Sequence, residues 1–338
     1  MSLIMSTIRI RTIVLGLTVW LSILPLTVSA NEKQRFFEFH GQVLDSEGRL
    51  IHSQPHVFLH GGTHPYNSHT QAGLDGRFKF RNLLPGSYVL IVAVPGEGEM
   101  KRTIEVGPTL ADKKGRVRDV IRFTASAQPD DRELIHSSQL KIPKQARQEL
   151  QRGLDCLGKN DIAGARKHFE AAVELAPHYS NAWNQLGVLA YQTAEYATAE
   201  RHFRRALKED PSSYPPLVNL GGALLALGKH EEALKINERA VRRAPEDALA
   251  HSQLGMSYVQ ARDFAKAELH LRQAIALDPG HFSAPQLVLA DLYLIQGRLK
   301  ERTNELEEYL KYHPDGRFAP QVRTMLEAAK NELEVSRP

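Results

Sequence analysis

The sequence contains a single cysteine, Cys156, and only two tryptophans. No intramolecular disulfide can form, so the fold must be held together by its hydrophobic cores. The chain has no G-x-S-x-G motif, phosphate-binding loop, H-E-x-x-H motif or Cys/His dyad. These absences argue against an enzyme, and we predict neither a catalytic residue nor a cofactor.

Neither sign of charge is in large excess. The 338 residues include 43 Lys and Arg against 39 Asp and Glu, a formal net charge of +4. Arg9 and Arg11 lie before Ala30 without an acidic residue, so removing that segment leaves 43 − 2 = 41 basic residues and a charge of +2. This balance gives no electrostatic reason to expect nucleic acid or an anionic membrane as a partner.

The N-terminal segment has the features of a targeting signal. An uncharged apolar run from Ile13 to Val28 follows the two arginines and ends in the small-residue site Val28-Ser29-Ala30. We predict a secretory signal peptide over residues 1–30, cleaved after Ala30. An uncleaved membrane anchor is the alternative. In either case we expect an exported bacterial protein, periplasmic or extracellular, tethered to the membrane if the segment is retained.

Residues 35–125 alternate apolar and polar side chains with a period of two, as strands with one buried face do. Turn-forming pairs such as Asp75-Gly76 and Pro85-Gly86 separate the candidate strands. We predict an all-β antiparallel sandwich of about seven strands. The candidate strands cover residues 37–43, 56–60, 78–80, 88–94, 102–106 and 117–123.

Two stretches of this region, "FHGQVLDSEGRLI" and "AGLDGRFKFRNLLPGSYVLIV", resemble the carboxypeptidase regulatory-like domain. The resemblance implies a transthyretin-like sandwich that serves as an accessory or adhesion module and is not catalytic. The matching positions are Gly41, Val43, Asp45, Gly48, Asp75, Gly76, Phe78, Phe80, Leu83, Pro85, Gly86, Tyr88 and Leu90.

Histidines recur every four residues at His52, His56, His60 and His64. Clustered neutral imidazoles are good ligands for zinc, copper or nickel, so these four are the only candidates for a metal site. Prolines and glycines interrupt the segment, however, and no cysteine completes a zinc set. We therefore expect solvated histidines of a strand and a loop, and no bound metal.

The C-terminal half repeats itself every 34 residues. Pro177, Pro211, Pro245 and Pro279 mark the period, and columns of glycine and alanine keep the same register. The pattern resembles the tetratricopeptide repeat, including its W-x-x-L-G start at Trp183. Each copy is a helical hairpin too small to bury its own apolar stripe, so the copies must stack. We predict a linker over 126–145, repeats over 146–179, 180–213, 214–247, 248–281 and 283–316, and a capping helix and tail over 317–338.

The resemblance implies that the first helix of each hairpin lines a concave groove. Most of the groove positions are aliphatic, which suits an apolar helix or an extended peptide segment. The alternative is that several of these side chains pack against a neighbouring repeat. Only Asn184 has a side chain of the type that clamps a peptide carboxylate in this family, so no such clamp is expected. The groove positions are Leu150, Leu154, Leu157, Asn184, Val188, Tyr191, Val218, Leu225, Ser252, Met256, Val259, Leu287, Asp291 and Leu294.

Taken together, these features predict a non-enzymatic scaffold. The helical array would bind a protein or peptide segment, and the strand module would contact a second protein, a glycan or the cell envelope. A carbohydrate-binding or envelope-binding accessory protein is the alternative, and a histidine-dependent metal-binding protein is the third reading. The oligomeric state remains open.

Overall fold

The computed structural model describes residues 35–51, 53–125 and 142–335. Seven strands come first along the described chain, and eleven helices follow. The predicted signal peptide and most of the predicted linker lie outside the described residues. Among the described helices, none combines the length and the hydropathy that a membrane crossing requires.

Three strands form one sheet in the order β4-β1-β7. They are β1 (Phe37–Leu44), β4 (Arg77–Leu83) and β7 (Arg116–Arg122). β1 pairs with β4 in antiparallel register but with β7 in parallel register. The prediction of a fully antiparallel arrangement is therefore wrong. β7 reaches β1 by crossing over from the other sheet, and such a crossover allows parallel pairing that a hairpin does not.

Four strands form the second sheet in the order β3-β2-β5-β6, and every pairing within it is antiparallel. They are β2 (His56–Gly61), β3 (Asn67–Gln71), β5 (Gly86–Val94) and β6 (Gly98–Val106). The sequence did not predict β3, because its residues NSHTQ include no large apolar side chain. This strand is held by pairing with β2 and not by an apolar face of its own.

The inward side chains of both sheets contribute to one hydrophobic cluster. Phe39, Phe78 and Phe80 come from the three-stranded sheet, and Leu59 and Leu90 come from the four-stranded sheet. The alternation of buried and exposed side chains along β1 and β4 follows directly from the period-two pattern. We refer to the seven strands as the strand module.

The helices pair into hairpins and stack along the chain. Within each hairpin the first helix packs on the second, and α12 (Ala319–Val335) packs on α11 at the end. The hairpins are α2 (Lys144–Leu157) with α3 (Ile162–Leu175), α4 (Ser180–Gln192) with α5 (Tyr196–Glu209), α6 (Tyr214–Ala226) with α7 (His230–Arg243), α8 (Ala248–Gln260) with α9 (Phe264–Leu277), and α10 (Pro285–Ile295) with α11 (Leu299–Tyr312).

The glycine column of the repeat is explained by close contact between the two helices of a hairpin. A Cβ atom added at Gly187 would lie 2.5 Å from Cε1 of Phe203, and one added at Gly153 would overlap the ring of Phe169. Both rings are buried. The aromatic ring of the second helix therefore occupies the space that a side chain at the glycine would need.

The turn between the two helices of each hairpin also repeats. One residue in each turn has a positive φ angle close to +60° or +70°, and only two of the five are glycines. A left-handed conformation costs about 1 kcal/mol or more for a residue with a Cβ atom. These residues are Asn160, Ala194, Gly228, Arg262 and Gly297.

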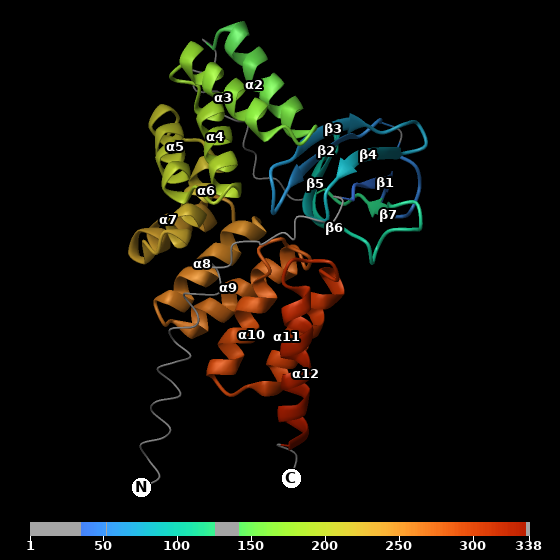
Figure 1. Ribbon diagram of the computed structural model, residues 1–338, viewed down its shortest axis with the longest axis vertical. Coiled ribbons are helices and arrows are strands. Elements are labelled where there is room, and N and C mark those ends of the chain that lie inside the picture. Colours follow the sequence, from blue (N-terminus) through green and yellow to red (C-terminus); the bar gives the residue numbers. More distant parts are fainter. Residues whose placement is uncertain (1–34, 52, 126–141, 336–338) are drawn as a thin grey trace.

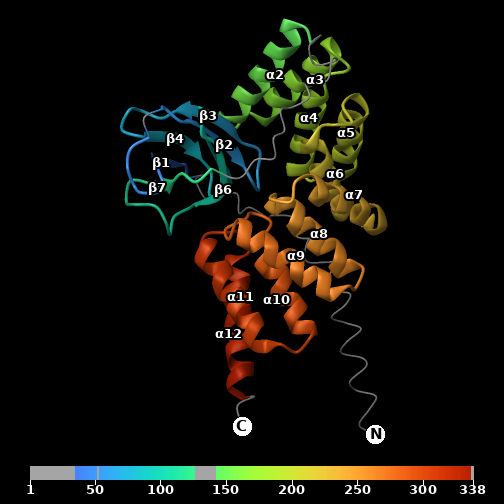
Figure 2. The same cartoon turned by 180° about the vertical axis from the view of Figure 1, so that it is seen from behind.

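The helical array curves, and the strand module lies on the concave side of the curve (Figures 1 and 2). The module approaches α2 near the start of the array and the loops around α11 and α12 near its end (Figure 1). The four-stranded sheet is the one on the side of the helices, while β4, β1 and β7 lie on the far side (Figures 1 and 2).

Candidate binding groove and module interface

Three of the predicted groove residues are buried between helices. Asn184 accepts a hydrogen bond from Nδ2 of Asn219 at 3.1 Å, and Ser252 accepts one from the Ser283 hydroxyl at 2.7 Å. Val218 belongs to a cluster formed by α6, α7 and α8 and is only 4% exposed. These side chains hold successive hairpins together and present no open surface to a ligand.

Most of the remaining aliphatic positions also pack between hairpins. Leu150 and Leu157 are buried in the cluster of the first two hairpins, and Leu154 packs against it. The others are half-buried against clusters further along the array. Val188 and Leu225 pack against one such cluster, Val259 packs against a second, and Leu287 packs against a third. This arrangement agrees with the alternative that several of the positions stabilise the stack.

An open part of the predicted groove remains. Tyr191 is 38% exposed, and Met256 and Leu294 are half-buried. Asp291 lies one turn from Leu294 on α10, and burial raises the pKa of its carboxyl to about 6 despite the opposing charge of Arg302. The first helices of the hairpins therefore present a mainly apolar face with one weakly acidic carboxyl.

A row of aspartates connects the array to the strand module. Oδ2 of Asp278 accepts hydrogen bonds from the backbone N–H of Thr103 at 3.0 Å and from its hydroxyl at 2.7 Å. The carboxylate of Asp315 holds the backbone N–H and the hydroxyl of Thr109 in the same way, at 2.8 and 2.6 Å. The inter-hairpin loops thus bind the edge of β6 and the loop that follows it.

The third aspartate, Asp247, has two roles. Its Oδ1 accepts the N–H of Ala250 as the N-cap of α8, and its Oδ2 lies 3.4 Å from Nζ of Lys101 on β6. Burial opposes ionisation of this carboxyl, but the Lys101 charge and the Ala250 N–H together keep its pKa below the usual value. Asp247 is therefore an ionised group at the module interface.

The strand module also contacts the first two hairpins. Nδ2 of Asn160 donates to the backbone carbonyl of Asn82 at 3.1 Å, and Nε2 of Gln192 donates to that of Gly61 at 2.9 Å. Gly158, at the end of α2, lies so close to β3 that an added Cβ would be 2.7 Å from the carbonyl oxygen of Asn67. The module therefore joins the beginning of the array to its end.

A buried contact between a histidine and a glutamate lies at the C-terminal end of this interface. Nδ1 of His313 is 3.2 Å from Oε2 of Glu105, and each side chain is only 3% exposed. The Ser87 hydroxyl donates to the same carboxylate oxygen at 2.7 Å. The other two polar atoms, Oε1 of Glu105 and Nε2 of His313, have no hydrogen-bond partner among the described residues.

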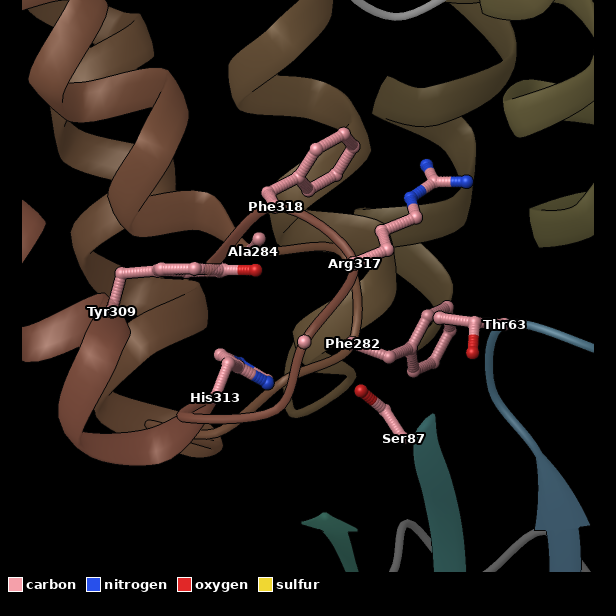
Figure 3. Close-up of a pocket in the computed structure, with 9 residues that line it drawn as sticks. Thr63, Ser87, Phe282, Ala284, Tyr309, His313, Arg317 and Phe318 are labelled. Atoms are coloured by element: carbon pink, nitrogen blue, oxygen red, sulfur yellow. The ribbon is translucent and has the colours of Figure 1, made fainter. Parts of the chain in front are cut away.

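A small cavity of about 20 Å³ adjoins the His313–Glu105 contact. Thr63 and Ser87 line it from the strand module, whereas His313, Tyr309 and Phe282 line it from the helical side (Figure 3). Its volume suffices for about one water molecule. The cavity is thus part of the module interface and too small for an organic ligand.

The predicted histidine cluster is divided among separate contacts. His60 shares a hydrogen bond of 2.8 Å with Asn67, while His64 shares one of 2.9 Å with the Tyr88 hydroxyl. Burial lowers the pKa of each imidazole to about 4. His56 is exposed at the start of β2, and His52 lies outside the described residues. The described part of the chain contains no group of three or more ligands arranged around a metal position.

Comparison with known proteins identifies the helical half. Three tetratricopeptide repeat models match the chain, at residues 150–214, 192–254 and 248–281. Residues 150–281 are tetratricopeptide repeats. The matched residues run from within α2 to just past the end of α9, so the first four hairpins fall within the tetratricopeptide region.

Two similar curated proteins are named as subunits of the anaphase-promoting complex. The anaphase-promoting complex subunit CDC16 of Saccharomyces cerevisiae is 26% identical over 143 residues, which are 40% of this chain and 17% of that protein. Anaphase-promoting complex subunit 7 of Arabidopsis thaliana is 29% identical over 181 residues, 53% of this chain and 32% of that protein. The chain therefore spans only a third or less of either relative.

One solved structure supports the helical fold, and a second is similar to the array. The APC/C hetero-tetramer Cut9–Hcn1 aligns with a TM-score of 0.51 at 19% identity, covering 58% of this chain and 38% of that chain. A thermophilic tetratricopeptide repeat protein of Thermus thermophilus aligns with a TM-score of 0.45 at 24% identity, covering 54% of this chain and 98% of that chain.

The sequence interpretation missed the residues that join the two modules. Asp247 and Asp315 are separated by two repeat periods. Asp278 lies between them in the sequence, in the loop that joins α9 to α10. An acidic residue recurring in the loops at one edge of a solenoid was visible in the sequence. Its role was not, because the strand that binds it lies well over one hundred residues earlier in the chain.

Proposed function

We propose that this protein is an exported, non-enzymatic interaction scaffold. The tetratricopeptide array binds a protein segment on the face formed by the first helices, and the strand module has an accessory role. The observation that carries the proposal is the partial exposure of Tyr191, Met256 and Leu294 on the first helices of three hairpins. Partly exposed tyrosine and methionine are well suited to holding an apolar helix or an extended segment.

The two regions of the chain take defined parts in this proposal. The seven strands form a sandwich of the carboxypeptidase regulatory-like kind, supported by the single cluster that both sheets share. The α10–α11 hairpin is a fifth repeat, and α12 caps its exposed face. Residues 1–30 direct export. Within the described residues, polar contacts at both ends of the array fix its curvature before a partner arrives, which lowers the ordering cost of binding.

The relatives support an assembly role by analogy. Their names describe them as subunits of the anaphase-promoting complex. From this similarity we infer only that the chain binds a protein, and we do not assign it the relatives' partners.

The test is capture of a partner by groove variants. Met256→Glu and Leu294→Glu place a charge on half-buried positions of the open face and should reduce capture from an envelope extract at least tenfold, since burying an unpaired carboxylate is costly. Leu269→Glu is the matched control, because Leu269 on α9 is 64% exposed and lies on a second helix. Far-ultraviolet circular dichroism should show the same helical content in all three variants. Equal capture by the groove variants and the control would contradict the proposal.

A further inference from the structure

The outward face of the three-stranded sheet is lined with basic side chains. Arg77, Lys79 and Arg81 alternate with buried phenylalanines along β4, and Arg118 and Arg122 point outward from β7. Between them runs β1, whose His40 is paired with Lys79 on one side and with Arg118 on the other. Neighbouring strands are about 4.8 Å apart, so these three side chains form one continuous row.

The charge of the strand module is divided unevenly between its two sheets. The three-stranded sheet and its turns, residues 36–51, 73–83 and 111–123, contain nine Lys and Arg against six Asp and Glu, an excess of +3. The rest of the module, residues 53–72 and 84–110, contains two against three, or −1. The near balance of the whole chain therefore conceals a locally basic surface.

Carboxylates on the basic face neutralise only part of it. Glu38 lies 3.4 Å from Arg81, and Asp112 pairs with Arg116 at 2.8 Å and Arg118 at 3.5 Å. Asp75 lies 3.7 Å from Arg77. Arg118 nonetheless retains 60% of its side-chain exposure and Arg77 retains 74%. Their guanidinium groups remain accessible to an anionic surface.

Apolar side chains accompany these charges. Val120 is 50% exposed and lies opposite Gln42 on the outward face. Leu50 is 48% exposed and pairs with Leu44, the outward residue at the end of β1. Phe36 is 47% exposed just before β1. The face therefore combines cationic and apolar groups and is turned away from the helices (Figures 1 and 2).

We propose that this basic face docks on an anionic phospholipid surface. Lys and Arg side chains are attracted by anionic headgroups, while exposed Leu, Val and Phe side chains enter the headgroup boundary. The proposal rests on the accessory role of the strand module stated above and names the partner of that role.

The composition of the face favours lipid over other polyanions. Single-stranded nucleic acid is held by stacking of bases on aromatic rings as well as by charge. The described strands of this face contain no Trp or Tyr, and their phenylalanines at positions 37, 39, 78 and 80 are buried. Apolar groups exposed among the cations add little to phosphate contacts in water but contribute directly at a membrane.

The test measures co-sedimentation with vesicles. The chain from Asn31 onward is used, since it lacks the apolar run but contains every described residue. It should bind vesicles of an equal mixture of phosphatidylcholine and phosphatidylglycerol, and not vesicles of phosphatidylcholine alone. The double variant Lys79→Glu/Arg118→Glu should bind at least about tenfold more weakly. Lys235→Glu/Arg242→Glu, on exposed positions of α7, changes the net charge equally and should bind like the parent chain.

A second variant separates lipid from other anions. Leu50→Ser/Val120→Ser keeps every charge, so it should weaken vesicle binding while leaving any binding to a DNA oligonucleotide unchanged. Equal vesicle binding by the Lys79/Arg118 variant and its α7 control would overturn the proposal, as would binding of the oligonucleotide without binding of vesicles. Met256→Glu should bind vesicles normally, so failure of the groove and failure of the basic face are read separately.

Discussion

The two sheets of the strand module share one core but differ on their outer faces. The four-stranded sheet and the loop after β6 meet the helical array through Lys101, Thr103, Glu105 and Thr109. The outer face of the three-stranded sheet is turned away from the array and presents arginines and a lysine, and the Asn82 carbonyl near the end of β4 is held by Asn160 of the first hairpin. The same period-two pattern builds both sheets, so the difference between a docked and a free face depends on which polar residues occupy the outward positions.

The largest expected effect is on the free energy of unfolding, and the test compares one carboxylate from each sheet. Glu105→Ala should lower the free energy of unfolding by about 3 kcal/mol, because it leaves His313 and Ser87 buried without their shared acceptor. Glu38→Ala, on the free sheet, should change it by less than about 0.5 kcal/mol, since Glu38 is 36% exposed. Urea unfolding gives both values. Equal effects would mean that the interface does not contribute to stability.

The next prediction concerns acid. Burial lowers the pKa of His281 to about 3 and of His60 and His64 to about 4, so all three are neutral in the folded protein at pH 7. The unfolded chain takes up protons below about pH 6.5. Stability should therefore be complete above pH 6.5 and should fall progressively as the pH is lowered towards 4.

The share of this acid sensitivity that comes from His281 can be measured by comparing melting temperatures at pH 7 and pH 5. His281→Gln should reduce the difference between the two, because Gln cannot be protonated. His230→Gln, on an exposed position of α7, should leave the difference as it is in the parent chain. A variant of His281 with the full pH dependence of the parent would show that this residue does not couple protonation to stability.

A smaller effect is expected from one threonine of the docked edge. Thr103→Val removes the hydroxyl that donates to Asp278 and keeps the backbone N–H that donates to the same oxygen. We expect a loss of about 1–2 kcal/mol, since burial already raises the pKa of Asp278 and the carboxylate then has one donor fewer. Thr70→Val on β3 is the control and should be nearly neutral. Hydrogen exchange in β6 reports whether the edge has loosened.

The smallest effect is a gain in stability. Ala194 has a φ of +62° in the turn after α4, two residues from Gln192, which contacts the strand module. Ala194→Gly should stabilise the protein by about 1 kcal/mol, because glycine adopts this conformation without strain. Thr193→Gly next to it should destabilise, since the Thr193 hydroxyl donates to the Leu189 carbonyl. Thermal melts of the two variants should shift in opposite directions.

The helical half was the easier half to predict. A 34-residue period places Gly187 against Phe203 in one hairpin and Gly153 against Phe169 in another, because the same two positions meet in every copy. Contacts of this kind lie within about twenty residues of each other, so local sequence contains both partners. The groove stays a prediction: Val218 and Ser252 make contacts between hairpins, and the repeat pattern alone does not distinguish such positions from a free face.

The strand module shows the limits of local patterns. Sequence patterns predicted the positions of β1, β2 and β4–β7, but β3 has no apolar face, and the parallel pairing of β1 with β7 depends on a crossover between sheets. The basic alternation of Arg77, Lys79 and Arg81 was present in the sequence. These residues form part of a larger basic face only because β7, nearly forty residues further along the chain, places Arg118 next to His40, on the other side from Lys79.

The sequence by itself determined the tetratricopeptide array, the alternating strands and the absence of a catalytic motif, since each of these follows from short-range periodicity or from composition. Only the tertiary structure decided that the strand module docks inside the curve of the array, that Asp247, Asp278 and Asp315 bind it, and that the outer face of one sheet is turned away from the array. The physical reason is that contacts between the two modules join residues up to 208 positions apart. Their partners are chosen by the way two folded modules fit together, which no local pattern contains.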